Sequence, residues 1–231
     1  MLPNFLLTET YGIEHLFENN GTLIYAFNHN NSLEALMVPA LIIYHQGGRR
    51  ISFVIDWMYG KIPIIGQIMD MIDPVYVYNK RTNIPWIVGK KQKATQDNVI
   101  EQCTRKVLAG NSIGIFPEGK RNKHPEMLLK GKPGVAHIAL RTGVPVIPVG
   151  IDFKTKKKRN KIPVIGRMTV RIGCPLSFRK ESETYREIIS GSVASNSDRK
   201  QLSRIAENVT HEIMISLAVL SGKQYSHPCP C

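Results

Sequence analysis

The chain has 231 residues, of which 42% are hydrophobic, so it is long and apolar enough to form one domain with a substantial core, and wholesale disorder is excluded. Its formal net charge of +13 predicts an anionic partner, such as a membrane surface, a phosphorylated substrate or an acidic protein. We expect no nucleic-acid partner, because aromatic residues make up only 7% and no nucleic-acid-binding motif occurs.

Apolar runs and turn residues predict strands that alternate with helices. Residues 1–17 carry scattered apolar positions that either pack on the domain or dock on a bilayer, and we favour packing. The elements then follow in chain order: a strand at 22–27, a helix at 33–41, a strand at 51–55, a short helix at 63–71, a strand at 74–78, a helix at 91–108, a strand at 112–116, a helix at 134–141, strands at 146–151 and 168–172, and a helix at 201–220.

This alternation predicts an α/β fold in which helices flank a central, largely parallel sheet. No internal repeat interrupts the chain, so we expect a single domain over residues 1–231. Residues 179–199 are polar and serine-rich, and we expect them to form a flexible excursion from this domain.

Cysteine usage and apolar content bear on the compartment. The four cysteines show neither a disulfide framework nor a paired CxxC motif, which favours a reducing, intracellular setting. The start of the chain lacks the basic and apolar regions of a secretory signal. The longest apolar stretch, residues 33–44, is too short to span a bilayer. We therefore expect a cytoplasmic protein that is soluble or peripherally membrane-associated.

The first candidate for chemistry lies where the strand at 22–27 meets the next helix. His29 ends this strand and Glu34 follows five positions later, so the helix start can bring the carboxylate back towards the imidazole. A carboxylate that accepts from one ring nitrogen fixes the tautomer and leaves the other nitrogen to take a proton from a hydroxyl. Taken alone, the pair is more simply explained as a turn histidine and a solvated helix residue.

The second candidate is Phe116-Pro117-Glu118-Gly119-Lys120-Arg121, just beyond the strand at 112–116. Ligands of open α/β sheets gather at the carboxyl ends of strands. Gly119 allows close backbone approach, Lys120 and Arg121 offer charge for a phosphate, and Glu118 can bind an acceptor hydroxyl or a basic side chain. By itself the segment fits a solvated basic loop equally well.

Two further segments carry weaker signals. Arg81 follows the strand at 74–78 and can clamp an anion with two parallel hydrogen bonds. The run from Val144 to Val149 is an apolar strand bracketed by prolines, which suits the wall of a pocket better than a reacting group.

In their order and spacing, these four segments resemble the signature blocks of the glycerolipid acyltransferase family, of the PlsC-like 1-acylglycerol-3-phosphate (lysophosphatidate) acyltransferase type. The matched blocks span residues 28–149. The matches are His29 and Glu34 to a histidine and an acidic residue separated by four positions, Arg81 to an arginine after a strand, Phe116 to Arg121 to a Phe-Pro-Glu-Gly-Thr-Arg block, and Val144 to Val149 to a Val-Pro-Ile-x-Pro-Val block.

The resemblance implies transfer of a fatty acyl group from acyl-CoA or acyl-acyl carrier protein to a hydroxyl of a lysophosphatidate-like acceptor, without a metal, a cofactor or a covalent enzyme intermediate. In such a site His29 is the general base and Glu34 orients it. The implied ligands of the acceptor's polar or phosphate end are Arg81, Glu118, Gly119, Lys120 and Arg121. The implied lining of the acyl or acceptor pocket is Val144, Pro145, Val146, Ile147 and Pro148.

Three positions depart from the family pattern: Glu34 stands in place of Asp, Asn31 in place of Ser and Lys120 in place of Thr. These changes surround the site, so they leave the identity of the acceptor more open than the reaction type. One alternative is an acyltransferase of specialised metabolism that acts on an alcohol or amine other than a glycerophosphate. A second alternative, from another class, is a non-catalytic module that binds lipid or acyl carrier.

Six basic residues lie between Lys154 and Lys161, after a predicted strand, and this indicates a hairpin tip or a loop. Such a run is usually a solvated face. It also suits anionic lipid headgroups, at about 1 kcal/mol per residue near a membrane surface. An acidic acyl carrier protein or the phosphates of CoA fit the same charge.

Overall fold

The computed structural model describes residues 8–18, 21–30, 34–57, 72–77, 99–159, 162–191 and 195–229, with the backbone alone for 34–36, 155–159 and 162–166. The strands are β1 (Thr8–Tyr11), β2 (Ile24–Phe27), β3 (Ile51–Asp56), β4 (Val75–Val77), β5 (Ser112–Ile115), β6 (Val146–Arg159) and β7 (Ile162–Ile172). The helices are the 3-10 turn η1 (Ile13–Leu16) and the α-helices α2 (Glu34–His45), α4 (Val99–Leu108), α5 (Gly134–Thr142), α6 (Arg179–Ser190) and α7 (Asn196–Ser221).

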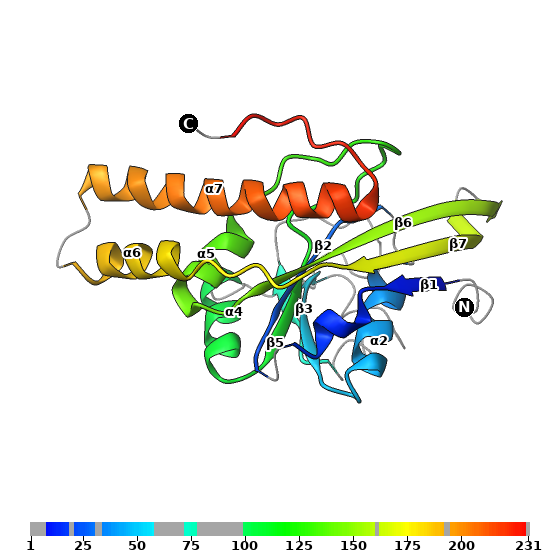
Figure 1. The fold of residues 1–231 in the computed structure, drawn as a ribbon, viewed down its shortest axis with the longest axis horizontal. Helices are drawn as coiled ribbons and strands as arrows, with labels where there is room; N and C mark the ends of the chain where they lie inside the picture. The colour runs from blue at the N-terminus through cyan, green and yellow to red at the C-terminus, as the bar shows by residue number, and fades with distance from the viewer. Residues whose placement is uncertain are drawn as a thin grey trace, which may run out of the picture.

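The strands form one seven-stranded sheet in the order β1-β7-β6-β2-β5-β3-β4 (Figure 1). Every neighbouring pair is parallel except β6 and β7, which form an antiparallel hairpin. The predicted α/β fold with a largely parallel central sheet flanked by helices is therefore confirmed.

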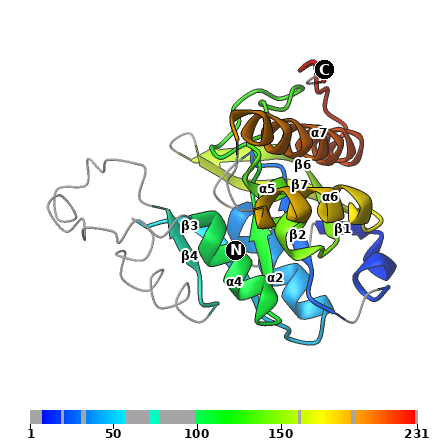
Figure 2. The same ribbon diagram turned by 90° about the vertical axis from the view of Figure 1, so that its left-hand side faces the viewer.

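Strand β2 is the centre of the core, and all four of its residues are buried. Ile24 and Ala26 belong to an apolar cluster with residues of α4, α5, α6 and α7, whereas Tyr25 and Phe27 belong to a second cluster with residues of α2 and η1. Because successive side chains of a strand point to opposite faces, β2 separates two helical layers. Figure 2 shows α5, α6 and α7 on one side of the sheet and α2 on the other.

Strands β6 and β7 are longer than the sequence predicts. Their antiparallel pairing runs from Val149 opposite Ile172 to Arg159 opposite Ile162, so the basic run lies in a hairpin, as expected. Apolar alternation in the sequence ends at Phe153, where the basic run begins, and the predicted strand ends at Ile151. Pairing continues because backbone hydrogen bonds between two strands do not require apolar side chains.

The prediction that residues 179–199 form a flexible excursion is wrong, because α6 and the start of α7 occupy its described part. The few apolar residues of α6 include Tyr185, which is 2% exposed and whose hydroxyl lies 2.6 Å from Nδ1 of His137 in α5. A capping box starts α7, since Ser195 and Asp198 exchange hydrogen bonds between side chain and backbone N–H. This Ser-x-x-Asp spacing is the local signal that the composition obscured.

The amino-terminal segment packs on the domain over its described residues, as favoured. Strand β1, which was not predicted, pairs with β7, and Leu16 of η1 is only 2% exposed. The helix predicted at 63–71 and the first part of the helix predicted at 91–108 lie outside the described residues. Within the described part of the chain, no helix combines the length and apolar character needed to cross a membrane.

Candidate active site

The carboxyl ends of β2 and β5 lie at one edge of the sheet, and the part of β6 around Val149 lies beside them, because β5 and β6 both run parallel to β2. His29 lies two residues beyond the end of β2, and Glu118 lies three residues beyond the end of β5. The structure therefore brings together two segments that are far apart in the sequence, at the place where open α/β sheets bind their ligands.

Asn28 fixes the end of β2 against β6. Its side chain is fully buried, its Nδ2 donates to the carbonyl oxygen of Ile151 at 2.9 Å, and its Oδ1 accepts from the N–H of Ile151 at 2.6 Å. Both backbone groups of Ile151 are thus paired by one side chain, which extends the sheet ladder by one step. Asn28 lies within the matched block, yet its role could not be assigned without β6 beside it.

His29 is half-buried, with its Nδ1 inside the protein. Its ring packs on Phe116, with 4.6 Å between the ring centroids and 38° between the planes. Phe116 in turn contacts Phe27 at 5.5 Å between centroids, so the imidazole ends a row of aromatic rings. Packing of this kind restricts the ring to one orientation, which a proton-transfer group needs.

Glu118 connects the two segments through the backbone. Its side chain is 1% exposed, its Oε1 accepts from the N–H of His29 at 2.9 Å, and its Oε2 accepts from the N–H of Leu129 at 2.9 Å. The carbonyl oxygen of His29 accepts from the N–H of Asn122 at 2.7 Å. Both backbone polar groups of His29 are therefore held by the loop that follows β5.

This geometry changes the role expected for Glu118. The sequence predicts that its carboxylate binds an acceptor hydroxyl or a basic side chain, and in the structure its two oxygens accept from backbone N–H groups. Burial raises the pKa of Glu118 above its ordinary value, and the N–H groups of Leu129 and His29, with the charge of Lys223, act in the opposite direction. Glu118 thus holds the backbone of His29 against the loop that follows β5.

Gly119 closes the turn after Glu118, since its N–H donates to the carbonyl oxygen of Phe116 at 2.9 Å with a φ of +65°. A Cβ at this position would lie 2.8 Å from carbon atoms of the Lys132 side chain, so Lys132 covers the turn. Lys120 and Arg121 are exposed beside it. Lys132 is not among the predicted site residues; Lys132 and Pro133 directly precede α5.

Of two further predicted site residues, one is described by its backbone alone and the other is not described. Glu34 is the first residue of α2, which is where the sequence placed the start of a helix, and its side chain lies outside the described residues. Arg81 also lies outside the described residues.

Of the residues predicted to line the acyl pocket, Val146, Ile147 and Pro148 are buried within β6. Val146 and Ile147 are fully buried, one in each core cluster, and Val146 pairs with Ile24 at the amino end of β2. Pro145 precedes them and its carbonyl oxygen accepts from the N–H of Ile24 at 3.2 Å. Val144 and Pro145 therefore lie near the start of β2, at the end of the strands far from His29. Pro148 is buried and pairs with Ala26. A proline-bracketed apolar run is compatible with a pocket wall and with a buried strand, and the strand register shows which residues lie inside the sheet.

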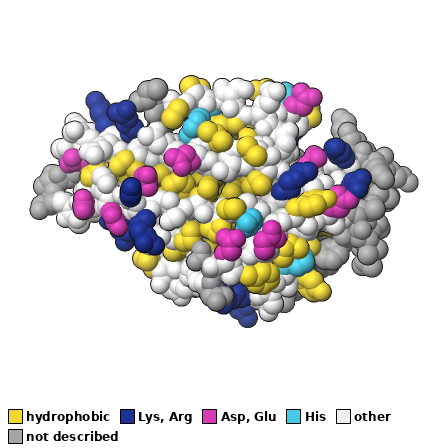
Figure 3. All heavy atoms as spheres, viewed as in Figure 1, with side chains coloured by type: hydrophobic (Ala, Val, Ile, Leu, Met, Phe, Trp, Pro, Cys, Tyr) yellow, Lys and Arg dark blue, Asp and Glu magenta, His cyan; other side chains and the backbone are white. Residues whose placement is uncertain are grey.

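Figure 3 shows Lys and Arg side chains in several separate groups on one face rather than in one continuous patch. Among the described residues, no group of three or more His, Cys, Asp and Glu side chains is placed to hold a metal ion.

The model of the acyltransferase family matches residues 8–152, which include every described element from β1 to the first half of β6. The chain belongs to the acyltransferase family. Within this family its relatives are PlsC-like glycerolipid acyltransferases, as the signature blocks predicted.

Relatives named 1-acyl-sn-glycerol-3-phosphate acyltransferases come from plants, animals and bacteria. A chloroplastic 1-acyl-sn-glycerol-3-phosphate acyltransferase of Brassica napus is 30% identical over 145 residues, which are 63% of this chain and 37% of that protein. A 1-acyl-sn-glycerol-3-phosphate acyltransferase of Haemophilus influenzae is 37% identical over 70 residues, 28% of this chain and 29% of that protein. This acyltransferase-family chain spans about a third of the length of the curated relatives it matches.

The crystal structure of the 1-acyl-sn-glycerophosphate acyltransferase PlsC from Thermotoga maritima shares the fold. The two structures superpose with a TM-score of 0.55 at 18% identity, over 90% of this chain and 72% of that one. The shared fold therefore extends beyond the part of the chain that the family model matches.

Proposed function

We propose that this protein transfers a fatty acyl group from a thioester donor to a hydroxyl of a lysophosphatidate-like acceptor, with His29 as the general base. The observation that carries the proposal is the arrangement around His29: its ring is fixed against Phe116 and its backbone is held by Glu118 and Asn122, beside the cationic turn at Gly119. The names of the relatives support the acceptor, since they describe 1-acyl-sn-glycerol-3-phosphate acyltransferases.

In the proposed reaction, His29 takes the proton of the acceptor hydroxyl as its oxygen attacks the thioester carbonyl carbon. The tetrahedral intermediate collapses with cleavage of the carbon–sulfur bond, and the imidazolium returns the proton to the departing thiolate. The products are an ester and a free thiol, so atoms and charge balance without a covalent enzyme intermediate, a metal or a cofactor. Glu34 in the orienting role and Arg81 in binding the acceptor phosphate complete the proposal.

The cations of the turn after β5 suit the phosphate of such an acceptor. Lys120 and Arg121 are exposed there, and the Lys132 side chain lies over Gly119. A dianionic headgroup gains most from several nearby cations, because each adds a charge-assisted hydrogen bond. We propose acyl-CoA or acyl-acyl carrier protein as the donor, since both are anionic thioesters that a chain of net charge +13 attracts.

The test is release of free thiol from each donor in the presence of lysophosphatidate, with the product identified by intact mass. We expect His29→Ala to lower turnover by about 10²- to 10⁴-fold, because it removes the general base. His45→Ala, at the last residue of α2, is the matched histidine control and should keep wild-type turnover. Near-normal turnover of His29→Ala would refute the role of His29.

The acceptor is tested separately with a panel of alcohols and amines that lack a phosphate. If one of them is acylated and lysophosphatidate is not, the protein is an acyltransferase with another acceptor. If the donor binds tightly and no acceptor releases thiol, the chain is a binding module and the catalytic proposal is wrong.

A further inference from the structure

Lys223 lies just beyond α7 and reaches the segment that carries His29. Its Nζ donates to Oδ1 of Asn30 at 2.6 Å and to the carbonyl oxygen of His124 at 3.1 Å. Asn30 directly follows His29, and His124 belongs to the loop between β5 and α5. One ammonium group therefore joins the two segments that meet at the candidate active site.

We infer that Lys223 is a positioning residue of this site, which sets the place of His29 by clamping Asn30 to the loop after β5. Its expected effect on turnover rests on the proposed function, whereas its effect on the position of His29 does not. Lys223 lies outside residues 8–152, the part of the chain that the acyltransferase model matches.

The backbone of Lys223 is itself held by the end of α7. Gly222 has a φ of +68° and ends the helix, and the N–H of Lys223 donates to the carbonyl oxygen of Ala218 at 2.9 Å. The helix end approaches β6 at Gly150, where an added Cβ would lie 2.4 Å from the carbonyl carbon of Leu220. The backbone that carries the Lys223 side chain is thus held in place by α7 and β6.

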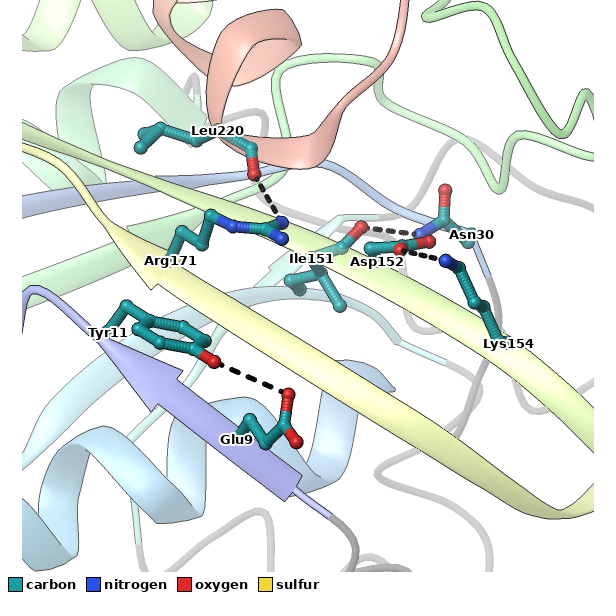
Figure 4. A network of polar contacts seen from close by, with 8 residues as sticks. All are labelled: Glu9, Tyr11, Asn30, Ile151, Asp152, Lys154, Arg171 and Leu220. Carbon is teal, nitrogen blue, oxygen red and sulfur yellow. Dashed lines mark hydrogen bonds and ion pairs between the residues drawn. The ribbon is translucent and has the colours of Figure 1, made fainter.

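The sheet also contacts Asn30 and the end of α7, the two parts of the chain that Lys223 connects. In Figure 4, Arg171 of β7 points to Leu220, and Asn30 points to Ile151 of β6. The Nη1 of Arg171 donates to the carbonyl oxygen of Leu220 at 3.1 Å, and Nδ2 of Asn30 donates to the carbonyl oxygen of Ile151 at 3.0 Å. Asn30 therefore has its amide nitrogen on β6 and its amide oxygen on Lys223.

The residue after Lys223 supports His29 by a second route. The N–H of Gln224 donates to the carbonyl oxygen of Glu126 at 2.8 Å, and its carbonyl oxygen accepts from the N–H of Leu128 at 2.9 Å. Leu129 follows, and its N–H is one of the two that Glu118 accepts. The charge of Lys223 also favours the ionised form of Glu118, against the effect of burial on its pKa.

The experiment compares Lys223→Met, which removes the ammonium group and keeps most of the aliphatic stem, with Lys223→Arg, which keeps a donor. Lys200→Met, at an exposed position near the start of α7, removes the same charge elsewhere. The first readout is hydrogen exchange of the backbone amides of His29 and Asn122. We expect Lys223→Met to accelerate both by about tenfold, while amides of α6 keep their rates.

The second readout is turnover. We expect Lys223→Met to lower kcat by about tenfold with little change in the KM for the acceptor, because a displaced base slows the chemical step without removing a substrate contact. Lys223→Arg should recover most of kcat, and Lys200→Met should match the wild type. Asn30→Ala removes the acceptor side of the contact, so its effect and that of Lys223→Met should be less than additive.

Wild-type exchange of the His29 amide in Lys223→Met would overturn the inference, whatever the activity. A rise in KM alone, with kcat and exchange unchanged, would also overturn it, because Lys223 would then bind substrate directly. If Lys223→Met unfolds, Asn30→Ala decides, because it removes the other side of the contact: wild-type exchange of the His29 amide in Asn30→Ala contradicts the clamp. Absence of acyl transfer in the wild type would refute the proposed function and leave the exchange test intact.

Discussion

Three side chains around His29 determine where its imidazole lies, and none of them reacts in the proposed chemistry. Asn28 ties the end of β2 to Ile151, Glu118 holds the N–H of His29, and Lys223 holds the next residue. The sequence singled out Glu118 by its block, but it did not indicate that the carboxylate bonds to backbone N–H groups. A buried carboxylate and an exposed ligand look alike in sequence, because burial depends on what packs over the side chain.

Replacement of Glu118 by Gln tests its positioning role. A glutamine amide presents one acceptor and one NH₂ group, so one of the N–H groups of His29 and Leu129 loses its partner. We expect the free energy of unfolding to fall by about 1–3 kcal/mol in urea titrations, together with a fall in kcat. Glu126→Gln, in the same loop and exposed, is the control and should leave both quantities unchanged. Wild-type stability of Glu118→Gln would argue against the two hydrogen bonds.

Among the elements, the β6–β7 hairpin departs most from a simple α/β sheet. Beyond Phe153 and Met168 it continues without β1, which pairs with β7 only from Met168 onward. Six residues in each strand extend by about 20 Å at the usual rise of a β-strand. Because Asn28 bonds to Ile151 of β6, the hairpin starts close to the candidate active site.

We propose that this hairpin contacts anionic lipid headgroups, which would bring His29 to a membrane surface. Its Lys156, Lys157, Lys158 and Arg159 lie in β6, and the apolar run Ile162-Pro163-Val164-Ile165 follows in β7. At about 1 kcal/mol per basic residue, replacing these four by Gln should weaken sedimentation with phosphatidylglycerol vesicles at least tenfold. Added salt should weaken wild-type binding as well.

The control for the hairpin removes the same charge from exposed positions of α6 and α7, by Gln at Arg179, Lys180, Arg199 and Lys200. Equal loss of vesicle binding in both variants would show that net charge alone drives the contact. If the hairpin variant binds vesicles normally and instead loses turnover with acyl-acyl carrier protein, the hairpin docks the acidic donor.

At the scale of the whole molecule, two buried ionisable groups make the free energy of unfolding depend on pH in the alkaline range. Burial raises the pKa of Cys103, in α4, to about 12, and burial likewise raises the pKa of Tyr25, in β2, to about 12, even though Gln46 donates to its hydroxyl at 2.6 Å. The native state keeps these two protons at pH values where the unfolded chain has released them. The two groups therefore contribute fully to the stability of the native state below about pH 9, and this contribution is lost as the pH rises to about 12.

Urea titrations from pH 8 to pH 11 should therefore show stability falling by up to about 1.4 kcal/mol per pH unit for each of the two groups. Cys103→Ala and Tyr25→Phe should each reduce the slope, because each removes one of the protons that the native state retains. A slope unchanged in both variants would contradict the burial of these groups. At pH 8 the Cys103 thiol should also resist alkylation while exposed Cys174 and Cys229 react.

The amino-acid sequence alone determined the α/β alternation, the family and the two segments that carry the site, because apolar periodicity and block spacing are local properties of a chain. The tertiary structure alone decided which groups hold His29. The contacts of His29 with Glu118, of Asn28 with Ile151 and of Asn30 with Lys223 span 89, 123 and 193 positions. It also made a helix of 179–190, since Tyr185 becomes an apolar anchor only when α5 covers it. Contacts over such separations leave no local trace, so they appear only when the sheet and α7 have brought the residues together.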